Sequence, residues 1–413
     1  MCLVAQSPAL RSFKHRNFRI LYPANALSNI GTWTQRVAQD WLVLELTNND
    51  PANLGLVTAV QFLPALLLSL YGGLLADRFN KRKLLLITNI GAGLSSVILG
   101  LLVISGSVQL WHVYALAFLL GIFTAVDSPI RISFTSELVG KDDLANAVSL
   151  NSANFNAGRL IGPALSGFLI ANFKTGPSFL LNTATYVVMV VTLLFIKDED
   201  LHITVKPKRD NKLKEAFQYV LKRRDISLVM VMVFFTTTFG LNFQIFIALM
   251  ATHEFNYGPG EFGVLGSILA VGSLTGAVLA ARLEKQRTIR NILRGAAVFS
   301  VLLMVSAYLP SPLLYACMLP LLGASVLLTL ISANTYVQSN TDSNLRGRVM
   351  GIYLMIFMGG APLGSPLVGG LAALIGIRGT ILVCAVIVLA AAFVVRRLYI
   401  KFNAERNNPK AID

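Results

Sequence analysis

The sequence predicts an all-α membrane protein whose twelve transmembrane helices form two pseudo-symmetric bundles of six. Three observations lead to this fold class. Hydrophobic residues make up 55% of the 413 residues and charged residues only 13%, about half the charged share that is usual in a soluble domain. Apolar runs long enough to cross a bilayer recur from Ile20 to Leu398. Basic residues gather in every second connection between those runs.

Apolar windows of about 20 residues give the predicted helices. In the first half they lie near 20–45, 54–76, 83–105, 111–133, 145–172 and 177–196. In the second half they lie near 226–251, 260–282, 290–309, 312–337, 347–374 and 378–398. We therefore expect an N-terminal bundle over 1–196, a polar linker over 197–225, and a C-terminal bundle with a cytoplasmic tail over 226–413.

The linker contains one further predicted helix. Apolar residues at positions 213, 216, 217, 220 and 221 lie on one face of an amphipathic helix over 213–222. We expect this helix to lie along the cytoplasmic membrane surface and to tether the two bundles.

The distribution of positive charge predicts the orientation. One set of connections holds nearly all the basic residues: Arg11, Lys14, Arg16, Arg19, Arg78, Lys81, Arg82, Lys83, Lys206, Lys208, Arg209, Lys212, Lys214, Lys222, Arg223, Arg224, Arg282, Lys285, Arg287, Arg290, Arg346, Arg348, Arg396, Arg397, Lys401, Arg406 and Lys410. The other set offers only Lys174 and Arg378. We expect a multi-pass protein of the inner cell membrane. By the positive-inside rule, both of its termini are expected in the cytoplasm. The net charge of +15 then reflects topology and anionic lipid headgroups, so it requires no nucleic-acid partner.

The first apolar run is expected to remain as a helix, because no small-residue cleavage site follows it at the distance of a signal peptide.

An internal repeat supports two similar bundles. The helix over 145–172 carries Gly158, Gly162, Pro163, Ser166 and Gly167, and 203 residues later come Ala361, Ser365, Pro366, Gly369 and Gly370. Glycines at four-residue spacing are also what close helix packing requires in any membrane protein. The added proline favours a bend where bundles rock against each other.

The connection after the helix over 54–76 carries a specific motif. Gly73, Asp77, Arg78, Lys81 and Arg82 fall in a stretch that resembles the Gly-x-x-x-Asp-Arg-x-Gly-Arg-Arg motif of the major facilitator superfamily. Asn80 stands where the family has glycine, and asparagine also tolerates a left-handed backbone. The resemblance spans essentially the whole chain and implies alternating access around a cavity between the bundles.

Two further stretches resemble subgroups of that superfamily. Residues 158–167, with Gly158, Gly162, Pro163 and Gly167, resemble the motif of antiporters that export drugs in exchange for protons, although Ser149 and Ser166 replace its glycines. Residues 16–19, 31–35 and 41–44 resemble the subgroup of enterobactin exporters and macrolide efflux proteins. These resemblances imply an exporter of amphipathic small molecules such as siderophores, macrolides or other drugs, driven by protons. We expect the protein to act as a monomer.

The helix over 20–45 carries a polar stripe that we expect to face the substrate cavity. Its members, at spacings of three and four, are Asn25, Asn29, Thr32, Arg36, Gln39 and Asp40, and we place Asn151, Asn154 and Arg159 of the helix over 145–172 in the same cavity. The alternative is that Asn and Thr side chains only hydrogen-bond neighbouring helices.

Arg36 and Asp40 are spaced to pair, which makes Asp40 the candidate for proton coupling, while a static ion pair is the alternative. Arg159 has no acidic neighbour in sequence. With Arg36 it predicts a positively biased cavity that prefers substrates with acidic groups.

A second set of charges is predicted to form a cytoplasmic gate. In the family, an acidic residue at the inner end of the fourth helix joins the motif at 73–83 in a charge cluster, and the residues that match these parts are Asp77, Arg78, Lys81 and Asp127. Arg131 follows Asp127 at a four-residue spacing, which favours a pair. The alternative is that the basic residues of the motif only determine topology.

Other function classes find little support. Three cysteines and four histidines offer no spacing for a disulfide framework or a metal, and no glycine-rich segment matches a phosphate-binding loop. We therefore expect no metal, no cofactor and no enzymatic activity. An importer or facilitator of the same fold is the first alternative, and a membrane enzyme is the remote one.

Overall fold

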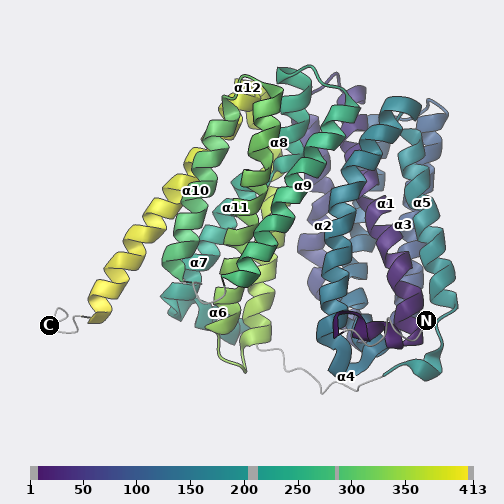
Figure 1. Ribbon diagram of the computed structural model, residues 1–413, viewed down its shortest axis with the longest axis horizontal. Coiled ribbons are helices and arrows are strands. Elements are labelled where there is room, and N and C mark those ends of the chain that lie inside the picture. The colour runs from purple at the N-terminus through teal and green to yellow at the C-terminus, as the bar shows by residue number, and fades with distance from the viewer. Residues whose placement is uncertain (1–7, 203–212, 284–287, 408–413) are drawn as a thin grey trace. The chain divides into compact units, whose positions relative to one another are not determined.

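The computed structural model describes residues 8–202, 213–283 and 288–407, which are almost entirely helical and include no strand (Figure 1). The α-helices are α1 (Arg16–Leu46), α2 (Pro51–Arg78), α3 (Lys81–Ile104), α4 (Leu110–Phe173), α5 (Gly176–Leu194), α6 (Leu213–Lys222), α7 (Arg224–Phe235), α8 (Phe243–Leu249), α9 (Pro259–Arg282), α10 (Ile289–Ala307), α11 (Pro312–Ser339) and α12 (Arg346–Asn407). Short 3-10 helices, η2 (Pro8–Lys14) and η3 (Asp198–Asp200), flank the first bundle.

Within these described ranges, nine helical spans are long and apolar enough to cross a membrane. Two of the nine contain two crossings each, because α4 turns at Gly140 with φ 70° and α12 turns at Gly376 with φ 74°. Glycine adopts this left-handed conformation without a steric penalty, so the chain reverses with no loop. The helix α1 is the twelfth crossing. It is not among the nine apolar spans because its polar stripe lowers its hydropathy. The predicted all-α fold with twelve crossings is confirmed.

The seventh predicted helix, over 226–251, is interrupted. It forms α7, the π-type turn η4 (Thr236–Gly240), α8, and the π-type turn η5 (Met250–Glu254). The hydroxyls of Thr236 and Thr237 bond back to the carbonyls of Met232 and Val233. Such local bonds and π-type turns distort a helix.

Contacts divide the chain into two units. The first comprises Met1–Asn49, Val60–Lys208 and Tyr257–Ser267, and the second comprises Asp50–Ala59, Arg209–Asn256 and Ile268–Asp413. Each unit thus takes a short segment from the other half of the sequence.

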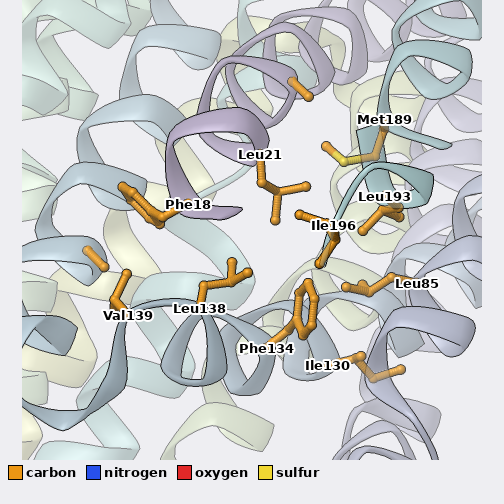
Figure 2. Close-up of a cluster of buried hydrophobic side chains, with 12 residues drawn as sticks. Phe18, Leu21, Leu85, Ile130, Phe134, Leu138, Val139, Met189, Leu193 and Ile196 are labelled. Atoms are coloured by element: carbon orange, nitrogen blue, oxygen red, sulfur yellow. The ribbon is translucent and has the colours of Figure 1, made fainter. Parts of the chain in front are cut away.

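The first unit has a buried core where α1, α3, α4 and α5 meet (Figure 2). Leu21, Phe134 and Ile196 point toward one another at its centre, and each is at most 3% exposed. This core lies at the start of α1 and the end of α5, so it holds together the helix ends that the positive charges predict to be cytoplasmic.

Small residues bring α1 and the second part of α4 together. A Cβ on Gly158 would lie 2.9 Å from the Asn29 carbonyl carbon, and one on Gly162 would lie 3.0 Å from the Thr34 amide nitrogen. Both glycines therefore permit close packing. Pro163 lacks an N–H, and the Ser267 hydroxyl bridges the helix there, donating to the Leu160 carbonyl (2.7 Å) and accepting from the Ala164 amide (3.1 Å).

In the second unit, α6 forms over the residues predicted for it. Ala216 and Val220 are buried, at 0% and 7% exposed, whereas Phe217 and Leu221 are exposed. Its apolar face is therefore divided between packing within the unit and the outer surface, and the membrane-surface position remains a prediction. The side chain of Leu213 lies outside the described residues.

Candidate functional site

The middle of α1 carries an aromatic residue, Trp33, with two arginines close to its ring. The guanidinium carbon of Arg36 lies 5.0 Å from the ring centre of Trp33, and that of Arg159 lies 5.9 Å from it. Arg36 also lies 5.1 Å from the Phe62 ring. These residues come from α1, α2 and α4, all within the first unit. Stacking on aromatic faces stabilises cations that have lost water.

The expected ion pair between Arg36 and Asp40 is not formed. Within the described part of the chain, no ion pair joins either arginine of this cluster to a carboxylate. The physical reason is direction, because side chains on a helix lean toward its N-terminus. Arg36 therefore reaches back to Trp33, three residues earlier, and away from Asp40. Its Nε atom is buried without a hydrogen-bond partner.

Asp40 lies in a closed environment, with only 3% of its surface exposed. The Arg36 charge acts on it from one helical turn away. The neighbouring Gln39 donates from Nε2 to Oε1 of Gln61 at 3.2 Å, which links α1 to α2. The carboxylate is therefore next to the two-arginine cluster without being bound by it.

Several residues predicted to line the cavity, from the α1 stripe and from α4, instead form hydrogen bonds between helical segments. Asn25 accepts a hydrogen bond from Arg131, and Asn154 donates to the Tyr22 carbonyl at 3.3 Å. Asn151 donates to the Thr135 hydroxyl at 3.2 Å. The other two members contact neighbours as well, with Asn29 against Gly158 and Thr32 beside Tyr186. For Asn25 and Asn154 the helix-bonding alternative describes the observed contacts.

Asp127 and Arg131 form the expected pair, with Arg131 Nε 2.7 Å from Asp127 Oδ2. The second carboxylate oxygen accepts from Thr88 and Asn89 of α3, both at 2.9 Å. Arg131 also reaches Asn25 of α1. This partly buried ion pair, with its further hydrogen bonds to α1 and α3, holds three helices in one register.

The motif at 73–83 pairs with a different acid from the one expected. Lys81 Nζ lies 2.6 Å from Glu137 Oε1, whereas Asp127 is occupied by the network around Arg131. Glu137 lies ten residues further along α4, about 15 Å nearer the connection that holds Lys81. The expected cluster of Lys81 with Asp127 is therefore wrong in its acidic member.

The remaining motif residues have separate roles. Arg82 donates to the carbonyls of Leu193 (2.7 Å) and Leu194 (2.8 Å), at the C-terminal end of α5, where a cation is favourable. Asn80 has an extended backbone and caps α3 by accepting from the Lys83 amide at 3.1 Å, so its role is capping and not the expected left-handed turn. Arg78 is exposed. The surroundings of Gly73 and the Asp77 side chain lie outside the described residues.

Two polar clusters were not predicted from the sequence. Gln35 Oε1 accepts from Ser96 and Asn182, both at 2.7 Å, in the centre of the first unit. The amide of Asn182, in the middle of an apolar helix, is the sequence feature that could have predicted this cluster.

The second cluster surrounds Asp143, in the connection between the two crossings of α4. Arg11 Nε, Lys14 Nζ and His15 Nε2 lie 2.6, 2.7 and 2.8 Å from its carboxylate, which is 2% exposed. Hydrogen bonds from Lys14 and His15 lower the pKa of Asp143. The cluster fastens η2 to α4.

No group of three His, Cys, Asp or Glu residues that could hold a metal is found in the described ranges.

Comparison with known proteins gives consistent results. A family model described as "Transmembrane secretion effector" matches residues 7–411. The chain is 25% identical over 392 residues to the staphyloferrin A transporter of Staphylococcus aureus, covering 93% of this chain and 97% of that protein. It is 24% identical over 308 residues to the enterobactin exporter EntS of Salmonella typhimurium, covering 73% of each. A bacterial homologue of the human lysosomal transporter Spinster, crystallised in an inward-facing and unoccupied conformation, has the same fold, with a TM-score of 0.75, 16% identity, and coverage of 96% of this chain and 98% of that one.

Proposed function

The chain belongs to the transmembrane secretion effector family of the major facilitator superfamily, and we propose that it exports an amphipathic small molecule with acidic groups in exchange for protons. The observation that carries the proposal is the position of Arg36 and Arg159 within 6 Å of the Trp33 ring centre, at 5.0 and 5.9 Å. Neither guanidinium is ion-paired within the described residues.

The depth of this cluster fits a transport site. Trp33 and Arg36 lie near the middle of α1, and Arg159 lies near the middle of the second crossing of α4. Substrate sites of secondary transporters lie near the bilayer midplane, where a charged side chain is costly and is retained for a function.

The chemistry of the cluster favours an acidic group. A guanidinium presents several N–H donors in a planar fork that matches a carboxylate or a similar anion. The Nε atom of Arg36 is buried and unsatisfied, so a substrate oxygen would supply a missing hydrogen bond. The Trp33 and Phe62 rings would contact apolar parts of the same substrate.

Asp40 supplies a route for proton coupling in this proposal. An antiport cycle requires that substrate and proton bind in alternation. Asp40 therefore carries its proton inward on the return step, after the substrate has left Arg36 and Arg159, and releases it to the cytoplasm before the next substrate binds. The Lys81–Glu137 pair is proposed to belong to the cytoplasmic gate.

The direction and the orientation are part of the same proposal. One relative is named as an enterobactin exporter, which supports export, and the basic connections favour cytoplasmic termini. We propose a monomer in the cell membrane, with bundles over 1–196 and 226–413 that rock around the linker.

Transport into inverted membrane vesicles tests the proposal. We expect an inside-acid proton gradient to drive uptake of acidic amphiphiles, such as catecholate or carboxylate siderophores, in preference to macrolides and cationic dyes. Stronger uptake of cationic dyes would exclude an acidic substrate class. If the same compounds accumulated inside intact cells in place of being depleted, the protein would be an importer.

A further inference from the structure

The second unit contains a cleft that the proposed transport site does not use. It has a volume of about 440 Å³ and lies between the start of α7 and the last turns of α12, the outermost helix of its unit in Figure 1. Arg224, Leu228 and Val231 of α7 line one wall, and Leu398, Lys401 and Phe402 of α12 line the other. All of them belong to the second unit.

The cleft is polar at one end and apolar at the other. The helix α7 begins at Arg224, and Leu228 and Val231 follow one and two turns deeper, so Val231 lies about 10 Å further along the axis. On α12, Leu398 precedes Lys401 by about one turn. Arg224 and Lys401 therefore share the end that the sequence predicts to be cytoplasmic, and the guanidinium of Arg224 lies 5.6 Å from the Phe402 ring.

The apolar walls remain open to the outside of the unit, with Val231 43% and Leu398 50% exposed. In a membrane protein such a surface contacts acyl chains. The described residues that line the cleft carry two positive charges, those of Arg224 and Lys401.

We propose that this cleft binds one anionic phospholipid of the cytoplasmic leaflet. The phosphate lies between Arg224 and Lys401, and an acyl chain lies along Leu228, Val231 and Leu398. Basic pockets between transmembrane helices on the cytoplasmic side bind anionic headgroups in this way. A free phosphate would share the polar contacts but would leave the apolar walls uncovered. The lipid would connect the end of α12 to α7.

The test uses the full-length protein, purified in detergent and delipidated, with lipid binding measured by native mass spectrometry. We expect phosphatidylglycerol to bind at least about tenfold more tightly than phosphatidylcholine with the same chains. Neither inorganic phosphate nor glycerol 3-phosphate should displace it. The double variant Arg224→Gln/Lys401→Gln should weaken phosphatidylglycerol binding by the same factor of at least about ten, to the level of phosphatidylcholine.

The matched control is Arg290→Gln/Arg294→Gln, which removes two exposed charges of α10 outside the cleft. It should change the affinity by less than about twofold. An equal loss in both double variants would show a diffuse basic surface and overturn the site. Equal affinities of the two lipids would overturn the headgroup preference, and displacement by glycerol 3-phosphate would overturn the lipid as occupant. These competitions on the unmodified protein decide the question even if a variant fails to fold.

Discussion

At the residue scale, the two arginines beside Trp33 carry the substrate prediction. We expect Arg36→Gln and Arg159→Gln each to raise the KM for an acidic substrate by roughly 10- to 100-fold, because a hydrogen bond to a charged group is lost. Uptake into inverted vesicles measures the change. Arg36→Lys keeps the charge but loses the planar stacking and should be intermediate. An unchanged KM in both glutamine variants, with Arg290→Gln as the matched control, would contradict an anion-binding role.

Asp40 carries the coupling prediction. In Asp40→Asn the side chain no longer exchanges a proton, so uptake driven by an imposed proton gradient should be lost. Exchange of labelled for unlabelled substrate should persist, because the arginine cluster remains. Both are measured in the same vesicles. If the variant kept its full proton dependence, Asp40 would not be the coupling residue.

Residue contacts were only partly predictable from spacing. Asp127 and Arg131 form the pair that a four-residue spacing favours. Arg36 and Asp40 have the same spacing, but the basic residue comes first, which is the less favourable order for a pair. The Arg36 side chain leans toward the N-terminus of α1 and contacts the Trp33 ring there. The partner of Lys81 depends on how far α4 extends beyond the membrane, which hydropathy alone does not define. Glu137 was missed for that reason.

At the element scale, the close contact between α1 and the second crossing of α4 depends on glycines, which have no side chain. We expect Gly158→Ala to destabilise the protein by about 1–3 kcal/mol, because the added Cβ would overlap the backbone of Asn29. The thermal unfolding midpoint in detergent measures the loss. Gly351→Ala is the control, since no atom lies within 4 Å of a Cβ at that helical position. Equal midpoints for the two variants would mean that α1 and α4 separate easily at this point.

The attachment of η2 to α4 should depend on pH. Arg11, Lys14 and His15 face Asp143 from the N-terminal segment, and the ring of His202 lies 5.6 Å from that of His15. Because the folded-state pKa of Asp143 is lowered, its contribution to stability is fully present above the unfolded-state pKa of about 4. It is lost as the pH falls through the lower folded-state value.

The thermal midpoint of Asp143→Asn, compared with the unmodified protein, measures this contribution. The variant should be less stable near pH 7, and the difference should shrink as the pH falls below about 4. A difference that grew on acidification would show that the cations around Asp143 repel one another more than the carboxylate attracts them.

At the scale of the whole molecule, the number of crossings was predictable because it depends on hydropathy and on charge in the connections. The connections themselves were not. Gly140 and Gly376 reverse the chain without a loop, so α4 and α12 each run through two predicted helices. The helix α1 is less apolar than the other crossings because it carries the candidate site. The polar residues that indicate a function in a membrane helix thus also weaken its hydropathy signal.

The orientation of the whole molecule decides which side of the membrane the basic cleft and the Lys81–Glu137 pair face. We expect Ser107→Cys, in the connection after α3, to react with a membrane-impermeant maleimide in intact cells. Ser343→Cys, in the connection before α12, should react only in inverted vesicles. Both positions are exposed, so access and not burial determines labelling.

Cys2, Cys317 and Cys384 are first replaced by serine to remove background labelling. The predicted pattern follows from the cost of moving the basic connections across the bilayer. The reverse pattern would place those connections outside the cell. The basic cleft would then face the outer leaflet, which contradicts a lipid of the cytoplasmic leaflet.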